Sequence, residues 1–320
     1  MTATSYSSGA SLQIEEFVRA RRASDSICDG YLSNLRRFDR MCAELFPGRD
    51  GLTQEMVDAW CERRERESAN TCISRCNAVV ALVKFLRARG ETDVVAPQLP
   101  RRTATELVPH AFTEDELARL FSECDAYRGR GCAPNVARRN ELVMPVVFRL
   151  LHGSGIRTCE ARLLRRRRVD LRTGVMRIVE GKGRSERLVA LHPSMAELMR
   201  RYDALMETLV PDREYFFPGS ADGHLGKCWL THHFRNLWSR VSDEPATVYQ
   251  LRHAYAVRNI DGLAGHGPCD LAELEYLSKA MGHSSIEVTI ASYYHSSPSL
   301  SEALQRRCAD ATGRVIPAVI

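Results

Sequence analysis

The chain has 320 residues, of which 44 % are hydrophobic and 27 % charged, the composition of a globular protein with about two domains. No apolar run is long enough to cross a bilayer, and the first residues lack a basic region followed by an apolar one, so we expect neither a membrane span nor a secretory signal. The 11 cysteines include no CxxC pair, which predicts reduced thiols, buried as small hydrophobic residues of a cytoplasmic protein.

Residues 11–90 are predicted to fold as a helical bundle, after a disordered N-terminus at 1–10. One helix is indicated by apolar residues that recur every three or four positions: Ile27, Tyr31, Leu35, Phe38, Cys42 and Leu45. A second pattern, with Met56 and Trp60, follows Thr53 as a candidate N-cap, and a further pattern ends at Gly90.

The helical pattern lapses over 91–111, which is predicted to be a linker. Pro97, Pro100 and Pro109 interrupt this stretch, and prolines disfavour helix and strand interiors. Arg101 and Arg102 lie between them and are candidates for contact with a polyanion.

A second domain is predicted over 112–297, followed by a tail at 298–320. Thr113 and Glu116 have the spacing of a capping box at its first helix. Two short β-prone runs flank the Gly-Lys-Gly around Lys182, which predicts a hairpin, and 215–217 could form one more short strand. Helical patterns dominate elsewhere, so the expected fold is mainly α with a small antiparallel β-sheet.

The segment 157–187 is strongly basic. It holds 11 arginines and lysines against four acidic residues, a balance that suits a polyanionic partner. The run Arg165, Arg166, Arg167 and Arg168 is a candidate face for a DNA backbone, with a solvated surface run as the alternative.

Four positions in this domain combine a charged residue with a turn or an apolar helix. Arg157 follows a glycine-containing turn at a helix start, with Glu160 three residues on, where a guanidinium can meet a phosphate with two hydrogen bonds. Lys182 lies at the hairpin tip. Arg252 lies on a mostly apolar helix, where a buried charge needs partners, and His283 follows a glycine.

In chain order these features are an arginine, a hairpin lysine, an arginine on a helix, a Gly-His pair and a tyrosine. That order resembles the tyrosine recombinase (phage integrase) family: "GIRTCEARLL" is similar to its first arginine box, "GKGRSERLVAL" to its lysine hairpin and "LRHAYA" to its second arginine box. "MGHSSIEVT" is similar to the stretch before its nucleophile. The resemblance covers most of 112–297. It implies an α+β catalytic domain there and a SAM-like, core-DNA-binding helical domain at 11–90.

The resemblance also implies roles for individual residues. Arg157 and Arg252 would clamp the scissile phosphate, and Glu160 would support the arginines. Lys182 would protonate the leaving 5′ oxygen, and His283 would hydrogen-bond the phosphate region. A tyrosine would attack phosphorus and form a 3′-phosphotyrosyl link, which retains the bond energy so that rejoining needs neither ATP nor metal; no cofactor is expected.

One position departs from the family pattern. Three residues before the second arginine the family usually has histidine, whereas this chain has Tyr249. A tyrosine can donate a hydrogen bond to a phosphate, but its ordinary pKa of about 10 makes it a poor proton shuttle near neutrality. Tyr249 is therefore a candidate site residue with an altered role, and the adjacent His253 is expected to be structural.

Two adjacent tyrosines compete for the role of nucleophile. The family's tyrosine more often lies nine residues after the histidine, which here is Ser292. Tyr293 is favoured because it needs the smaller shift and because Tyr293 and His295 reproduce the family's Tyr-x-His ending; Tyr294 is the alternative. A straight helix would carry the tyrosine too far from the histidine, so we expect a break around 289–292.

The implied function is site-specific recombination of a mobile element, by integration, excision or transposition. The implied partner is double-stranded DNA at specific sites, contacted by Arg101, Arg102, Arg184 and the arginine run, with no membrane partner. The resemblance further implies a chain that is monomeric when free and tetrameric in the synapse, with the tail exchanged between subunits, and leaves room for other recombinases or host DNA-bending proteins. The alternatives are type IB topoisomerase-like activity and a catalytically impaired DNA-binding accessory protein.

Overall fold

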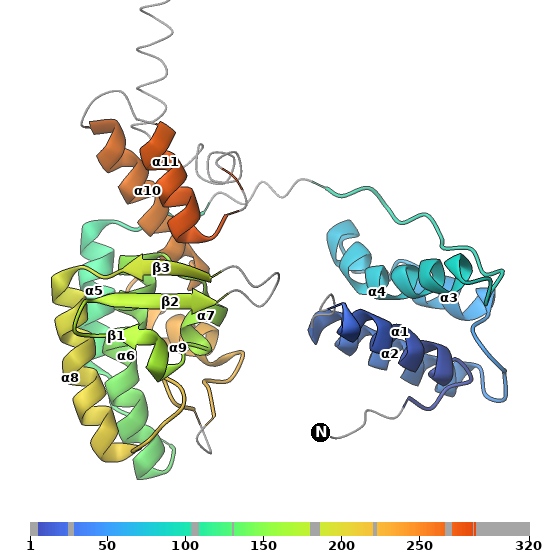
Figure 1. Ribbon diagram of the computed structural model, residues 1–320, viewed down its shortest axis with the longest axis horizontal. Coiled ribbons are helices and arrows are strands. Elements are labelled where there is room, and N and C mark those ends of the chain that lie inside the picture. Colours follow the sequence, from blue (N-terminus) through green and yellow to red (C-terminus); the bar gives the residue numbers. More distant parts are fainter. Residues whose placement is uncertain are drawn as a thin grey trace, which may run out of the picture. The chain divides into compact units, whose positions relative to one another are not determined.

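The computed structural model describes residues 6–24, 29–103, 109–129, 131–179, 186–219, 223–265, 271–283 and 285. The chain divides into two compact units, Met1–Glu106 and Leu107–Ile320 (Figure 1). Helices dominate both units, and the sheet lies in the second, so the predicted class, mainly α with a small antiparallel sheet, is confirmed.

The first unit is a helical bundle in its described residues. Its elements are α1 (Ser11–Ala23), α2 (Asp29–Leu45), α3 (Gln54–Cys61) and α4 (Ala69–Ala88). Thr53 caps α3 as predicted, because its side chain accepts the Met56 N–H, and Ser68 caps α4 by accepting the Thr71 N–H. Phe38 of α2 packs edge to face on Trp60 of α3 within the apolar core, with ring centroids 5.7 Å apart.

The segment after α4 is tied to this unit. The carboxamide of Gln54 accepts the Val95 N–H at 2.8 Å and donates to the Val95 carbonyl at 3.1 Å. The carboxamide of Asn70 pairs in the same way with the backbone of Thr103, at 3.2 and 2.7 Å. Each amide therefore bonds one residue of this segment as a neighbouring strand would, and Val94, next to the first anchor, is buried.

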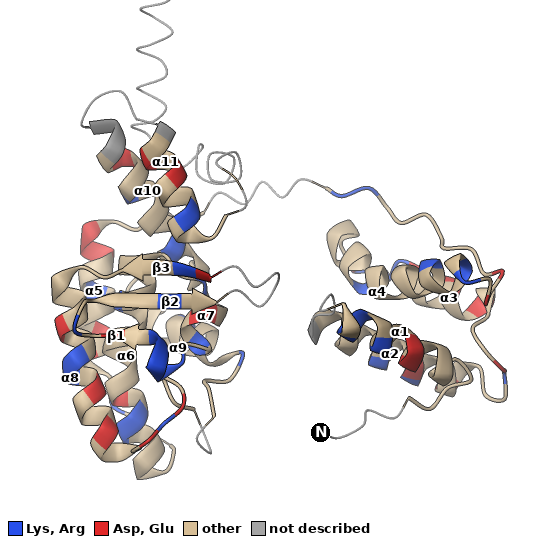
Figure 2. Ribbon diagram, in the orientation of Figure 1, with Lys and Arg blue, Asp and Glu red and all other residues tan. Residues whose placement is uncertain are grey.

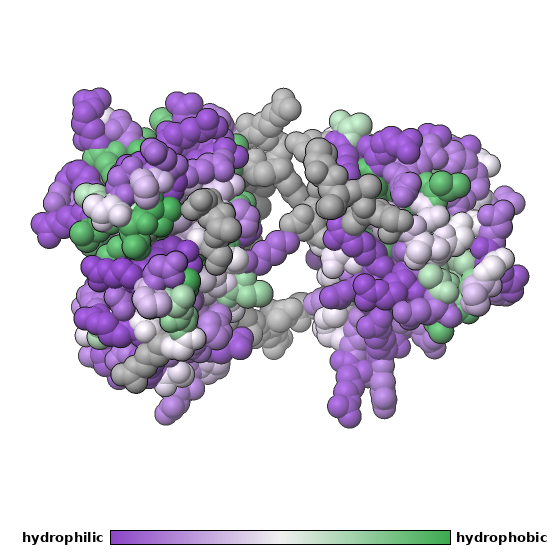
Figure 3. Space-filling model, turned by 90° about the horizontal axis from the view of Figure 1, so that it is seen from below, coloured by the Kyte–Doolittle hydropathy of each residue, from purple (hydrophilic) through white to green (hydrophobic). Residues whose placement is uncertain are grey.

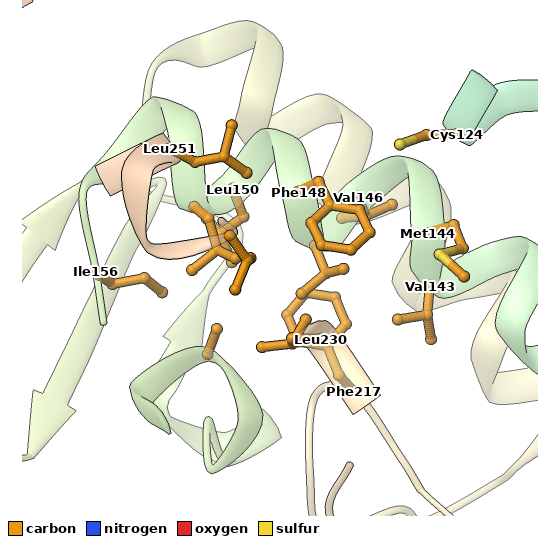
Figure 4. Packing of buried hydrophobic residues seen from close by; sticks show 14 of the residues in the cluster. Cys124, Val143, Met144, Val146, Phe148, Leu150, Ile156, Phe217, Leu230 and Leu251 are labelled. Carbon is orange, nitrogen blue, oxygen red and sulfur yellow. The ribbon is translucent and has the colours of Figure 1, made fainter. Parts of the chain in front are cut away.

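The second unit is built around one long helix. In its described residues the helices are α5 (Glu114–Ala126), α6 (Pro134–Ser154), α7 (Thr158–Arg162), the 3-10 turn η1 (Arg166–Arg168), α8 (Pro193–Leu209), α9 (Trp229–Trp238), α10 (Tyr249–Gly265) and α11 (Leu271–Met281). Helix α6 contacts α5, α8 and α10. Figure 4 shows Phe148 and Leu150 of α6 packed among Leu230, Phe217 and Leu251 in the core. Thr113 and Glu116 form the predicted capping box at α5.

The sheet has the order β1-β2-β3, with both pairs antiparallel. Its strands are β1 (Val169–Asp170), β2 (Val175–Val179) and β3 (Glu186–Ala190). Strands β2 and β3 are the two arms of the predicted hairpin, and Met176, Ile178 and Val189 turn into the core. The strand expected at 215–217 is wrong: Tyr215 forms only an isolated bridge with Arg165, because the ladder there is limited to the Arg166 N–H on the Glu214 carbonyl and the Phe216 N–H on the Leu164 carbonyl.

Helix α11 packs away from the main core. It forms a separate apolar cluster with the second half of α10, made of Ala256, Ile260, Leu274, Leu277 and Met281. The two helices lie beside each other at the β3 edge of the sheet (Figure 1). Helix α11 ends at Gly282 in the left-handed conformation, where the Gly282 N–H donates to the Lys279 carbonyl and the His283 N–H to the Ser278 carbonyl. This motif sets the direction in which His283 leaves the helix.

The expectation that the cysteines are buried is wrong for part of the chain. Five of the described cysteines are buried, whereas Cys132, Cys159 and Cys228 are exposed. The exposed three lie in a loop, on the short α7 and at the residue before α9, where little packs over them. The face shown in Figure 3 is mostly hydrophilic on both units, with small hydrophobic patches. No helix in the described part of the chain is long and apolar enough to span a membrane.

Candidate active site

Arg157 stands at the turn between α6 and α7. Gly155 ends α6 with φ of +63°, Ile156 is fully buried, and Arg157 precedes the first residue of α7. The Glu160 carboxylate accepts the Arg157 N–H at 2.7 Å and the Arg157 Nη1 at 3.0 Å. The other guanidinium nitrogen, Nη2, donates to the Gly282 carbonyl. Arg157 therefore connects α7 to the end of α11.

Arg252 is buried on α10, with 2 % of its surface exposed. Its partners are two carbonyl oxygens and one imidazole: Nη1 donates to Gly155, and Nη2 donates to Met281 at 2.8 Å and to His283 Nε2 at 3.0 Å. The predicted need for partners is met, although none of them is an acid. Arg252 Nε is buried without a hydrogen bond among the described residues.

His283 accepts a hydrogen bond from Arg252. Because a guanidinium has no acceptor, Nε2 of the ring must be unprotonated in this contact, which leaves the proton on Nδ1. The arrangement joins the Gly-His pair and the second arginine box, 31 positions apart in the chain.

Glu160 is the acid that the site is built around. Its side chain is 6 % exposed and also accepts two hydrogen bonds from Arg187 of β3, at 2.9 and 2.7 Å. Burial alone would raise the pKa of the Glu160 carboxyl, but the hydrogen bonds from Arg187 and from the Arg157 backbone outweigh burial and hold this pKa below its ordinary value. Glu160 therefore remains a carboxylate and accepts two hydrogen bonds from Arg157.

The sequence-based prediction missed Arg187 as a site residue. A signal was present: alternation along β3 puts Arg187 on the same side as the buried Val189, and a charge on that side needs a partner. The sequence does not distinguish Arg187 from the other arginines and lysines of the basic segment 157–187.

Tyr249 is the first residue of α10 and is 52 % exposed. No hydrogen bond joins its hydroxyl to Arg252 or His283 among the described residues. His253, one position after Arg252, is buried, and burial lowers its pKa below the ordinary histidine value. A buried position of this kind agrees with the structural role expected for His253.

The predicted DNA-contacting arginines divide into two groups. Arg165 pairs with Glu214, and Arg166 pairs with Asp203 and Glu207, all acids on or just after α8. Arg167 is exposed, and neither it nor Arg168 has an acidic partner within the described ranges. Figure 2 shows this basic turn beside the mixed charges of α8.

Arg101 and Arg102 are exposed between the two anchors of the segment after α4. Lys182, Arg184, Tyr293 and Tyr294 lie outside the described residues, as do the expected helix break and the tail.

The site thus consists of three arginines, one carboxylate and one imidazole drawn from the α7 start, β3, α10 and the end of α11. Three guanidiniums against one carboxylate leave a surplus of two positive charges among the described residues of the cluster. Such a surplus suits an oxyanion such as a phosphodiester.

Comparison with known proteins identifies the family of this chain. Residues 110–299, more than half of the chain, match the model of the phage integrase family. Tyrosine recombinase XerD of Rhizobium meliloti (strain 1021) is 27 % identical over 225 residues, covering 69 % of this chain and 68 % of that protein. Tyrosine recombinase XerD of Shewanella oneidensis is 25 % identical over 288 residues, covering 86 % and 88 %. For two further relatives, this chain covers less than two thirds of the relative's own length, 61 % and 65 %.

A solved Tn1549 transposon integrase in complex with circular intermediate DNA shares the fold, with a TM-score of 0.59 and 15 % identity over 92 % of this chain and 99 % of that one. The chain belongs to the phage integrase family, the tyrosine recombinases, which are enzymes that cleave and rejoin DNA.

Proposed function

We propose that the chain is the site-specific recombinase of a mobile element and exchanges DNA strands between two specific sites. The observation that carries the proposal is the convergence of Arg157 and Arg252 on the successive carbonyls of Gly282 and Met281. Two guanidiniums side by side repel each other, and an anion held between them relieves that repulsion. A phosphodiester carries one negative charge and gains another in the transition state of attack, which matches the positive surplus of the cluster.

The proposed reaction begins with Tyr293. The Tyr293 hydroxyl releases its proton to solvent as its oxygen attacks phosphorus, the bond from phosphorus to the 5′ oxygen breaks, and a 3′-phosphotyrosyl link forms. Lys182 gives a proton to the leaving 5′ oxygen, while Arg157 and Arg252 stabilise the charge on the two other oxygens. Rejoining reverses these steps with the 5′-hydroxyl of the other DNA, so the number of high-energy bonds does not change.

The partner and the assembly are part of the proposal. Solved neighbours include a XerH site-specific recombinase bound to its difH substrate and the Tn1549 transposon integrase on DNA, and we extend DNA binding to this chain from them. Strand exchange between two sites, each bound by two copies, needs four copies, with the tail at 298–320 as the exchanged segment. Arg101, Arg102 and Arg184 would contact the DNA backbone.

A suicide substrate tests the proposal. A duplex from the end of the element, nicked close to the cleavage point, loses a short fragment after cleavage and traps the covalent intermediate. We expect a protease-sensitive adduct with the unaltered chain and with Tyr294→Phe, and no adduct with Tyr293→Phe. The reverse pattern would move the nucleophile to Tyr294. No adduct from the unaltered chain would favour a DNA-binding accessory protein.

A plasmid assay separates recombination from topoisomerase activity. We expect exchange between two plasmids that carry the element's ends. Relaxation of supercoils without any exchange would contradict the recombinase assignment and leave the topoisomerase-like alternative.

A further inference from the structure

Three successive carbonyls at the end of α11 are each held by an arginine from a different element. Ala280 accepts from Arg187 Nε of β3 at 2.8 Å, Met281 accepts from Arg252 of α10, and Gly282 accepts from Arg157 before α7. The last carbonyls of a helix lack partners within the helix and carry the negative end of its dipole, so cations are favoured there.

These polar contacts position the end of α11. The apolar side chains of α11 belong to the separate cluster with α10, not to the main core. Contacts with β3 are therefore what relates α11 to the sheet, and Arg187 supplies a hydrogen bond across that boundary. His283 leaves α11 directly after the three carbonyls, so its position follows that of the helix end.

Arg187 also determines how Arg157 and Glu160 interact. The Arg187 guanidinium donates hydrogen bonds to both carboxylate oxygens of Glu160, whereas the Arg157 guanidinium donates only to Oε1. Without Arg187, the Arg157 guanidinium would be the one remaining charged partner of the buried Glu160 carboxylate among the described residues, and a carboxylate that is 6 % exposed needs such a partner. Arg157 would then turn onto Glu160 and away from a phosphate.

We propose that Arg187 is a positioning residue for DNA cleavage: it neutralises Glu160, so that Arg157 stays available to the phosphate, and it holds the end of α11, so that His283 stays against Arg252. This inference rests on the proposed function. Arg187 itself acts through its neighbours and is assigned no contact with the DNA.

The test compares Arg187→Met with a matched control, Arg149→Met. Arg149 of α6 makes a similar but more exposed set of contacts elsewhere in the unit. It forms a bidentate ion pair with Asp125 at 2.8 Å and donates to the carbonyls of Pro145 at 2.9 Å and Phe121 at 3.4 Å. The measured quantity is the rate of adduct formation on the suicide substrate at saturating DNA, alongside the DNA dissociation constant and thermal unfolding.

We expect Arg187→Met to slow adduct formation on the order of 100-fold, because a displacement of about 1 Å at a reacting site has that effect. DNA affinity should stay within about threefold, since most phosphate contacts lie elsewhere. Arg187→Lys should recover only part of the rate, because an ammonium cannot hold both oxygens and the carbonyl in one plane. Arg149→Met should lower thermal stability without slowing adduct formation in the folded protein. Equal rates for Arg187→Met and the unaltered chain, or equal slowing in both Met variants, would overturn the proposal.

Hydrogen exchange gives a readout that does not depend on cleavage. The amides of Gly282 and His283 are bonded at the end of α11 and should exchange faster in Arg187→Met, but not in Arg149→Met. Unchanged protection would overturn the positioning role. Faster exchange together with no adduct from the unaltered chain would contradict the proposed function while leaving the contact network correct.

Discussion

Gly155 satisfies two conditions at a single residue. Its φ of +63° is the left-handed region that ends α6, and its carbonyl accepts from Arg252. A Cβ added there would lie 2.3 Å from the ring of Tyr255 on α10. Only glycine therefore allows α6 to end, α10 to approach and Arg252 to reach its acceptor at the same place.

Gly155→Ala is expected to lower the free energy of unfolding by about 2–5 kcal/mol, the sum of left-handed strain and overpacking. It should also slow adduct formation, because Tyr255 and Arg252 share α10. The control is Gly131→Ala, where φ is +73° but nothing lies within 4 Å, so only about 1–2 kcal/mol of strain is expected. Equal losses for the two variants in urea unfolding would contradict the close contact with Tyr255.

The residues of the site could be predicted to different degrees. Arg157, Glu160, Arg252 and His283 carry motif signals, and the structure brings these four together through the end of α11. The roles assigned to Tyr249, Lys182, Tyr293 and Tyr294 remain predictions. Arg187 could be found only from the folded sheet, since alternation shows that it faces inward but not which carboxylate it meets.

At the scale of elements, the loop between α3 and α4 is ordered by a buried ion pair. Arg75 of α4 donates to both Glu67 oxygens, at 2.8 and 2.6 Å, and to the Glu62 carbonyl at 3.0 Å, and it lies over the Trp60 ring. The pair is 9 % and 7 % exposed. Arg75 and Glu67 therefore attach the polar stretch "CERRERESAN" to the core.

This ion pair predicts an acid-sensitive first unit. Hydrogen bonds from Arg75 lower the pKa of Glu67 from 4.5 to about 2 despite burial. The folded state therefore binds the proton less readily than the unfolded state, so the stabilisation is complete above about pH 4.5 and is lost as the pH falls toward 2. Glu67→Gln should flatten the pH dependence of the free energy of unfolding in that window. Glu65→Gln, an exposed residue of the same loop, should not; a curve unchanged by Glu67→Gln would contradict the assignment.

For the predicted linker at 91–111, composition predicts the secondary structure but not the tertiary contacts. Its prolines indicate the absence of helix and strand, and the described part through Thr103 has neither. They do not reveal that Gln54 and Asn70 pair with this backbone, because those partners lie about 30–40 positions away in the chain. Arg101 and Arg102 are consequently carried on the first unit in a defined place.

For the whole molecule, the net charge of +5 does not reveal which cations are available to DNA, because that depends on which of them are already in ion pairs. In the run from 165 to 168, Arg165 pairs with Glu214, and Arg166 pairs with Asp203 and Glu207 of α8. The last two arginines have no acidic partner among the described residues. The run therefore contains two arginines that are held in ion pairs within the protein and two that have no acidic partner among the described residues.

Salt dependence of DNA binding should separate these pairs. Arg167→Gln/Arg168→Gln is expected to weaken binding and to reduce the slope of log K against log salt by about 1–2, since each lost phosphate contact removes about 0.9. Arg165→Gln/Arg166→Gln should leave the slope nearly unchanged while lowering thermal stability. A larger change of slope in the second variant would show that the ion pairs with α8 open when DNA binds.

The sequence by itself determined the class of fold, the helices and their caps, the hairpin and the order of the family motifs, because each depends on residues within a few positions of one another. Only the tertiary structure decided which carbonyls satisfy Arg252, that Arg187 shares Glu160 with Arg157, and which arginines of the run are already paired. Those contacts join α7, β3, α10 and α11 across 27 to 125 positions, and periodicity along a chain carries no information on such distant partners.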